Sequence, residues 1–504
     1  MNSVYLPLLR DQLARLKAAG AEYADVRFHD YDESESLFFL QGELRGCEQN
    51  SKFGIGVRVL ADGAWGFASA SSLNDLDGTF QRALRSAKEA AKCLERPISL
   101  APRDVLNNVR FKSPCKVDPF DIPLSEKIEF FKSVDAKLQK DFVKQRFLSY
   151  ESEHRQIHFL DSEGSYGVRD IVDIFAGMRV VGLDVDGLSQ ERTYNLTLDP
   201  NGTRGWELLR DPKCFLNHAE RIVNELESVL SAPVCPKDVR SVILKPGIMF
   251  LQTHEVVGHA LELDRILGYE LSFAGGSFVR LQDFGTLRYG SDKMNVAADA
   301  TLPNSPGSFG FDDDGVPCQN VTLIKNGILE SALTSRQTIT EANEKAGMII
   351  FEKSGASNRA TDFTRAPIER MTNINILPGT DGTLEDIVRS TKKGIIMDGD
   401  RSWSIGSNRE QFHFACEIGW LVEDGAITGI VRNPTYSSPT LPFWRSMSAV
   451  GNASTCELVQ VANCGKGLPS QVMRLGHLVP VCRFDNVQIA YRRSCSPRRP
   501  CGRR

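Results

Sequence analysis

The sequence predicts an α+β fold, with a first half of helices and β-hairpins and a β-rich, largely antiparallel second half. Apolar residues recur at helical spacing in several segments of the first half. Asp-Gly and Asn-Gly dipeptides, which supply the positive φ angles of tight turns, separate pairs of strand-like runs. In the second half, we expect only one long helix, and it carries two closely spaced histidines.

Residues 1–234 form the predicted N-terminal α+β domain. Apolar spacing predicts four helices, the first around Leu9–Leu16, the second from about Leu76, the third after a Ser125 N-cap and the fourth over 215–230. Between the first two helices, Asp62-Gly63 joins two strand-like runs as a hairpin. Two prolines in the segment 231–238 follow the fourth helix, and we place a domain boundary there.

Residues 235–490 form the predicted β-rich catalytic domain. Asn326-Gly327 and Asp424-Gly425 predict two further hairpins. The histidine-bearing helix is expected to begin near Pro246 and to end near Gly268. Residues 491–504 contain six arginines and little to bury, which predicts a disordered tail.

Bulk composition excludes several classes of protein. Hydrophobic residues make up 41% of the 504 residues and charged residues 25%, as in soluble globular proteins. The formal net charge of −4 gives no chain-wide attraction to nucleic acid or anionic lipid. No run approaches the roughly 18 apolar residues of a membrane span. The start of the chain lacks the features of a signal peptide, and the twelve cysteines form no C-x-x-C pair. We therefore expect a cytoplasmic protein with reduced cysteines.

The stretch "QTHEVVGHALELD", residues 252–264, contains two histidines around a glutamate. In the zinc-protease pattern H-E-x-x-H the histidines are four apart, but His254 and His259 are five apart. On a regular α-helix this spacing turns the second imidazole about 140° from the first. One π-type turn would bring the two imidazoles to within roughly 50° of each other. Because Gly258 is where the helix loosens most readily, we predict a π-bulge or helix distortion there.

A catalytic zinc usually takes three protein ligands, so a third residue must join the two histidines. The residues alone leave several candidates open: Glu262 or Asp264 in the same helix, another histidine, or a cysteine. Cys464 begins the glycine-rich turn "CGKG", where little side-chain bulk hinders a ligand, although a lone cysteine is more often a small core residue. His154 and His158 are four apart, but their segment alternates like a strand, and we interpret them as structural.

The combination of "THEVVGHALELD" and a distant "NCGKG" resembles the TldD/PmbA family of zinc metallopeptidases, specifically the TldD-type subunit that carries H-E-x-x-x-H. "FGIGVRVLADGAWGFA", "GSFGFDDDGVPCQNVTLIKNGIL" and "GSNREQFHFACEIGWLVEDGAITGIVRNPTY" also look like family segments. The resemblance covers roughly residues 22–488. It implies that His254, His259 and Cys464 bind zinc and that Glu255 is the catalytic base.

The resemblance also implies a substrate class and an assembly. It implies hydrolysis of unstructured peptides inside an enclosed cavity of a dimer. The dimer is either a homodimer or a heterodimer with a PmbA-type sister subunit that lacks the metal motif. A His/His/Cys set favours zinc, although nickel, cobalt or iron could occupy such a site.

Two other functions compete with a peptidase. One is a non-catalytic scaffold that binds peptide or serves as the partner subunit of a protease complex; the complete set of His254, Glu255, His259 and Cys464 argues against it. The other is modulation of a topoisomerase through nucleic acid, against which the net charge argues, apart from the arginine-rich tail. The acidic run Asp312–Asp314 could suggest a fragment of an EF-hand, but it lacks the rest of that loop.

Overall fold

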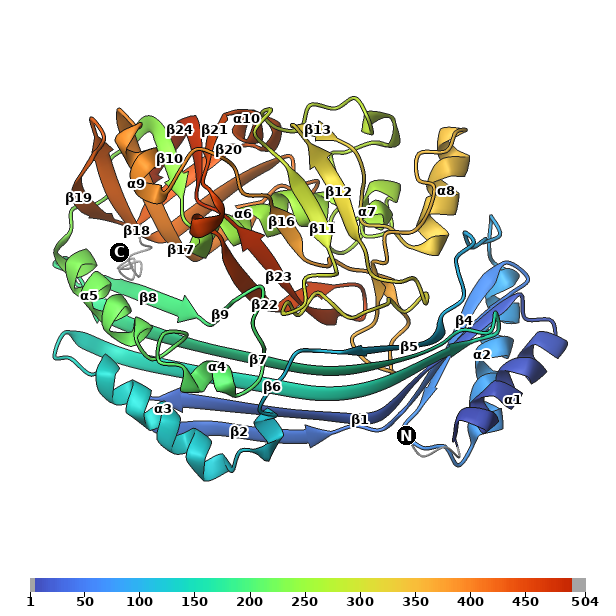
Figure 1. The fold of residues 1–504 in the computed structure, drawn as a ribbon. Coiled ribbons are helices and arrows are strands. Elements are labelled where there is room, and N and C mark those ends of the chain that lie inside the picture. The colour runs from blue at the N-terminus through green and yellow to red at the C-terminus, as the bar shows by residue number, and fades with distance from the viewer. Residues whose placement is uncertain (1–4, 492–504) are drawn as a thin grey trace, which may run out of the picture.

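The computed structural model describes residues 5–491, and it has the predicted α+β architecture (Figure 1). Within these residues, no helix is long and apolar enough to cross a membrane. Of the predicted disordered tail, residues 491–504, Tyr491 is instead the last residue of a β-strand, because it pairs with Pro434, and residues 492–504 lie outside the described residues.

A curved eight-stranded sheet forms the base of the molecule (Figure 1). Its strand order is β4-β3-β1-β6-β7-β5, with β2 paired to β1 and β8 paired to β7. The long central strands β1, β6 and β7 are antiparallel neighbours, and β5 is the parallel edge strand. The strands are β1 (Tyr23–Leu40), β2 (Glu43–Ser51), β3 (Gly54–Ala61), β4 (Ala64–Ala70), β5 (Asn107–Lys112), β6 (Val143–Asp161), β7 (Tyr166–Leu183) and β8 (Ser189–Asn195).

Helices pack on the two ends of this sheet. α1 (Tyr5–Ala18) and α2 (Leu76–Ala91) lie at one end, and α3 (Leu124–Leu138), the short α4 (Glu207–Arg210) and α5 (His218–Ser231) lie at the other (Figure 1). Each end has its own buried apolar cluster. The predicted start of α2 is confirmed. α3 begins before Ser125, because the extended Pro123 already sets its first turn, and α5 begins three residues later than predicted.

The predicted hairpins are confirmed, and each has two residues with positive φ at its turn. The φ angles are 50° and 73° at Asp62-Gly63, 48° and 78° at Asn326-Gly327, and 47° and 81° at Asp424-Gly425. Asp and Asn tolerate this left-handed conformation better than other non-glycine residues, and glycine adopts it freely. The turns join β3 to β4, β12 to β13 and β18 to β19.

The second half is built around a closed ring of strands. β10 pairs with β17 in parallel and with β24 in antiparallel, and the order β10-β17-β18-β20-β24 returns to β10, so this sheet closes on itself. β19 and β21 are attached to β18 and β24. The strands are β10 (Asp238–Leu244), β17 (Lys393–Ile405), β18 (Gln411–Glu423), β19 (Ala426–Arg432), β20 (Pro434–Pro439), β21 (Met447–Val450) and β24 (Cys482–Tyr491).

Smaller sheets connect this ring to the rest of the chain. β13-β12-β11-β16 form one, β14-β15 a second and β23-β22-β9 a third. The third sheet joins the two halves, because β9 comes from the first half and pairs with β22. Whether the two halves fold as separate domains, divided at residues 234/235, stays a prediction. The strands are β9 (Thr197–Leu198), β11 (Val296–Asp299), β12 (Asn320–Lys325), β13 (Ile328–Leu329), β14 (Asn358–Arg359), β15 (Ile368–Glu369), β16 (Ile374–Ile376), β22 (Glu457–Lys466) and β23 (Gln471–Val479).

The expectation of only one long helix in the second half is wrong. α8 (Arg336–Ala346) is eleven residues long. Its signals are present in the sequence: the Ser335 side chain accepts from the Thr338 amide, and Gly347 ends the helix with a φ of 67°. The short helices α9 (Leu384–Arg389) and α10 (Thr440–Arg445) complete this half.

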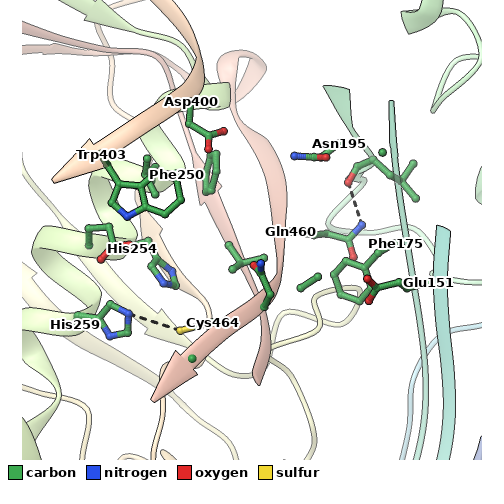
Figure 2. A pocket seen from close by; sticks show the side chains of 18 of the residues that line it. Glu151, Phe175, Asn195, Phe250, His254, His259, Asp400, Trp403, Gln460 and Cys464 are labelled. Atoms are coloured by element: carbon green, nitrogen blue, oxygen red, sulfur yellow. Dashed lines mark hydrogen bonds between the residues drawn. The ribbon is translucent and has the colours of Figure 1, made fainter. Parts of the chain in front are cut away.

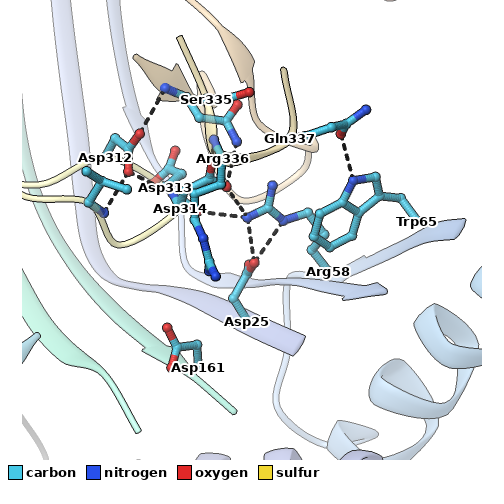
Figure 3. Close-up of polar contacts among 12 residues, drawn as sticks. Asp25, Arg58, Trp65, Asp161, Asp312, Asp313, Asp314, Ser335, Arg336 and Gln337 are labelled. Carbon is cyan, nitrogen blue, oxygen red and sulfur yellow. Dashed lines mark hydrogen bonds and ion pairs between the residues drawn. The ribbon is translucent and has the colours of Figure 1, made fainter. Parts of the chain in front are cut away.

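A buried acidic loop, Asp312–Asp314, joins the second half to the N-terminal sheet (Figure 3). Arg58 of β3 donates from Nη2 to Asp314 Oδ1 at 2.8 Å and from Nε to Asp25 Oδ2 at 2.8 Å. Arg169 of β7 donates to Asp313. These ion pairs fix the position of the second half on the curved sheet.

Candidate metal centre

The helix that carries the two histidines is irregular, as predicted. α6 (Pro246–Thr253) begins at a proline and is followed by one π-helical turn over His254–Gly258. The predicted continuous helix to Gly268 is wrong beyond this turn. A short 3₁₀ turn follows, Glu262 is extended with ψ of 118°, and the helix resumes only as α7 (Leu263–Leu267) before the left-handed Gly268.

The π turn brings the two imidazoles to the same side of the helix. The ring centroids of His254 and His259 lie 4.8 Å apart, with their planes at 85°. Gly258 also serves this packing. A Cβ at this position would lie 2.3 Å from the Sδ atom of Met371, so any larger residue would force the buried Met371 side chain or the turn to shift.

Cys464 reaches the histidines from β22. The register between β22 and β23 shifts between Val461 and Cys464, and such a bulge changes the direction in which a side chain points. Cys464 Sγ lies 3.7 Å from His259 Nε2. Burial raises the pKa of the Cys464 thiol, but His259 beside it lowers the pKa to below its ordinary value. The sulfur is therefore poised to become a thiolate, the form in which cysteine binds metals.

Three side chains thus converge in what we call the metal centre: His254, His259 and Cys464 (Figure 2). One ligand atom of each lies within 4.8 Å of the other two, and the side chains are nearly buried, with 5–6% exposure. Around a tetrahedral zinc ion, nitrogen and sulfur donors at ordinary bond lengths are separated by roughly 3.5 Å. The observed sulfur–nitrogen separation matches this value, and the donor set suits zinc.

Glu262 supports His259 and does not face the metal centre. Its Oε2 atom lies 3.0 Å from His259 Nδ1. Burial raises the pKa of Glu262, but Lys466 and Arg265 together lower it well below its ordinary value, so the carboxylate stays ionised. Asp264, the other acidic candidate for a third ligand, accepts from Lys466 Nζ at 2.7 Å. A carboxylate on the outer nitrogen fixes a ligand histidine's tautomer and orientation.

His477 supports His254 in the corresponding position. It lies on β23 and is wholly buried, and its Nε2 atom is 2.9 Å from His254 Nδ1. The sequence reasoning missed Glu262, Lys466 and His477 as supporting residues. Lys466 had a signal, because it is two residues after Cys464 and two-residue spacing keeps side chains on one face of a strand. Nothing local marks His477.

A cavity of about 620 Å³ opens beside the metal centre (Figure 2). Both halves of the chain line it. Glu151 and Phe175 come from the N-terminal sheet, and Phe250 and Trp403 come from the second half. Half-buried Glu255 lines the same cavity as the three candidate ligands. A substrate in this cavity would contact the candidate base and the candidate metal ligands together.

The remaining histidine pair is structural in position, as interpreted from the sequence. His154 and His158 lie in β6. His154 is held between Asp118 and Asp170, at 2.6 Å and 2.8 Å, and these two carboxylates raise its pKa to about 9 although burial lowers it. A histidine that is protonated between two carboxylates has no lone pair for a metal.

Three family models match successive parts of this chain. They are described as PmbA/TldA metallopeptidase domain 1, central domain and C-terminal domain, and they match residues 24–91, 117–227 and 237–491. A Methanocaldococcus jannaschii protein named a metalloprotease is 29% identical over 90% of this chain and 94% of its own length. A Saccharolobus solfataricus protein named a zinc metalloprotease TldD homolog is 26% identical over 93% of this chain and 99% of its own.

Two solved structures share the fold. A Thermotoga maritima protein whose name refers to modulation of DNA gyrase has a TM-score of 0.73 at 16% identity, with 96% of this chain and all of that chain covered. TldE from Thermococcus kodakarensis has a TM-score of 0.67 at 16% identity, with the same coverage. At such identities the likeness shows the fold alone.

Proposed function

The chain belongs to the PmbA/TldA metallopeptidase family, and from this premise we propose that it is a zinc-dependent peptidase. The observation that carries the proposal is the convergence of His254, His259 and Cys464 from segments more than two hundred positions apart. A non-catalytic scaffold has no need for a buried set of nitrogen and sulfur donors. These donors are costly to bury unless something satisfies them.

In this proposal, His254 Nε2, His259 Nε2 and Cys464 Sγ hold the ion. Bound zinc supplies Lewis acidity, which acidifies water and polarises a peptide carbonyl. Glu255 takes a proton from the attacking water and passes it to the leaving amine, the ordinary work of a general base and acid. Because it lies next to His254 and lines the cavity, Glu255 is the carboxylate in position to do so.

We extend the proposal to the substrate and the assembly. The substrate is an unstructured peptide that binds in an extended form, since strand edges near the cavity recognise backbone without regard to side chains. The active form is a dimer with an enclosed cavity, either of two identical chains or with a PmbA-type sister, and we place it in the cytoplasm.

Metal analysis of the purified protein tests the proposal. After exhaustive dialysis, elemental analysis is expected to find about one zinc per chain in the wild type and almost none in Cys464→Ala. A quenched fluorescent library of unstructured peptides is expected to be cut by the zinc-loaded wild type and not after treatment with a chelator. A metal-free wild type that folds normally and cuts nothing would move the assignment to a peptide-binding scaffold.

A further inference from the structure

His477 contacts His254 of the metal centre but lies outside both sequence motifs that supply the candidate ligands. It lies in β23, two residues before the end of that strand, and is fully buried. Two asparagine side chains pin the backbone on either side of it. Asn373 Oδ1 accepts from the Gly476 amide at 3.1 Å, and Asn375 Oδ1 accepts from the Leu478 amide at 2.9 Å. The imidazole is therefore held at a fixed place beside His254.

The hydrogen bonds of His477 determine which nitrogen carries the proton. Its Nδ1 atom lies 2.7 Å from the carbonyl oxygen of Ile374, and a carbonyl oxygen only accepts, so Nδ1 carries the hydrogen. A neutral imidazole has one N–H group, and Nε2 is then an acceptor. His477 is fully buried, and among the described residues no carboxylate forms an ion pair with it, so no counter-charge favours a protonated ring.

This assignment continues through the next ring. Because His477 Nε2 accepts, His254 Nδ1 must be the donor across the 2.9 Å contact. His254 then has its lone pair on Nε2. We propose that His477 is a positioning residue that locks His254 in the Nδ1–H tautomer, with the Nε2 lone pair directed at the metal. The proposal rests on the zinc binding proposed above and adds that His477, although not a ligand, affects the zinc affinity.

The two histidine ligands thus have different supports. His259 is backed by the ionised Glu262, whose charge Arg265 and Lys466 balance. His254 is backed by a neutral ring, and in the part of the chain described here no lysine or arginine forms an ion pair or hydrogen bond with the residue at position 477. A carboxylate there would be a buried charge without a partner, which is costly. A neutral imidazole orients His254 without adding that charge.

Zinc affinity in a matched set of variants tests the proposal. We would measure the dissociation constant by competition with a fluorescent zinc chelator for wild type, His477→Ala, His477→Gln and His158→Ala. The outer amide of glutamine reaches about as far as histidine Nε2, so its oxygen can accept from His254. His158 is an equally buried histidine in the N-terminal sheet and controls for the loss of a buried ring.

We expect His477→Ala to weaken zinc binding by about 10- to 100-fold, the usual effect of removing a partner of a ligand histidine. His477→Gln should recover most of that loss, and His158→Ala should bind zinc as the wild type does. Unchanged affinity in His477→Ala overturns the proposal. So does a glutamine variant as weak as the alanine variant, because the ring would then act as a ligand or as packing.

Nitrogen NMR of histidine-labelled, metal-free protein gives a readout that does not depend on zinc. The expected spectrum shows the Nδ1–H tautomer for both His254 and His477. An Nε2–H tautomer at His254 contradicts the proposal even if the wild type binds zinc. If the wild type binds no zinc but both tautomers are as expected, the proposed function fails while the positioning of His254 stands.

Discussion

The acidic loop and the metal centre are both clusters of buried ionisable side chains, but they differ in how many of their polar atoms have hydrogen-bond partners within the chain. In the acidic loop, each carboxylate oxygen of Asp312, Asp313 and Asp314 accepts a hydrogen bond from the chain itself. In the metal centre, the outer nitrogens of His254 and His259 have partners. The inner atoms of the two rings and of Cys464 face one another.

This difference distinguishes a structural cluster from a candidate ligand site. Buried polar groups are nearly always satisfied, so a complete set of internal bonds leaves no role for a ligand. The acidic loop is complete, and this argues against the EF-hand interpretation of its three aspartates. The metal centre directs three ligand atoms at one point, and among them the structure has only the long 3.7 Å contact between Cys464 Sγ and His259 Nε2. The comparison predicts that changes in the metal centre alter activity and metal content, while changes in the acidic loop alter stability.

The largest expected effect is at the candidate base. Glu255→Gln keeps the shape of the side chain but removes its basicity, so peptide cleavage should fall by about 10²- to 10⁴-fold, the usual contribution of general acid–base catalysis. Zinc content and the unfolding midpoint should match the wild type. Glu129→Gln, on the exposed side of α3, is the control. Cleavage by Glu255→Gln at a wild-type rate would remove Glu255 from the mechanism.

The next largest effect is expected in the acidic loop. Arg58→Met removes the guanidinium that pairs with both Asp25 and Asp314, and two buried carboxylates lose their cation. Breaking a buried pair in this way destabilises a protein by about 3–5 kcal/mol. Urea unfolding should show this loss, with zinc content per folded chain unchanged.

Arg82→Ala is the control for the Arg58 variant. Arg82 pairs with Asp75 on the surface, where such a bridge contributes about 0–1 kcal/mol. If Arg58→Met lost zinc in its folded fraction, the two clusters would be coupled, and the separation drawn above would not hold.

A pH dependence sharpens the comparison further. Burial raises the pKa of Asp313, but Arg169 and Arg27 outweigh it and lower the pKa to about 2. The folded pKa is below the unfolded value of about 3.9, so the charged form stabilises the fold by on the order of 2 kcal/mol at neutral pH. This contribution is present above pH 4 and is lost as the pH falls through 2.

The measurement is the difference in unfolding free energy between wild type and Asp313→Asn. We expect Asp313→Asn to be less stable at pH 7 and the difference to shrink as the pH falls from 4 towards 2. A difference that stays constant over this range would mean that the Asp313 carboxylate is not held charged by the two arginines.

Local signals predicted the elements of the fold, and tertiary contacts determined the rest. The Asp62-Gly63 hairpin and the start of α2 followed from turn chemistry and apolar spacing. The closed ring around β10 did not, because pairing with both β17 and β24 joins segments about 150 to 250 positions apart by contacts that no local pattern encodes. The helix α8 was predictable, because its capping residues Ser335 and Gly347 are local signals in the sequence.

The candidate site divides in the same way. The five-residue spacing of His254 and His259 predicted a distorted helix, and the π turn confirms it. Cys464 was one candidate among several until the family resemblance selected it. The position of His477 beside His254 could not be predicted from the sequence, because it depends on two hydrogen bonds made only when β23 lies against α6 and β16.

The smallest expected effect, at Gly258, tests why the helix is distorted. Gly258→Ala places a Cβ 2.3 Å from Met371 Sδ, and the overpacking should cost about 1–3 kcal/mol of stability. Because the same shift moves His259, zinc affinity should fall too. Met371→Ala, added to Gly258→Ala, makes room for the methyl group and should restore much of the lost stability and zinc affinity. Only the double variant can show this coupling between the two positions. Gly429→Ala, where a Cβ meets open space, is the control. If stability falls but zinc affinity does not, the π turn tolerates the shift, and the five-residue spacing alone sets the geometry of the two histidines.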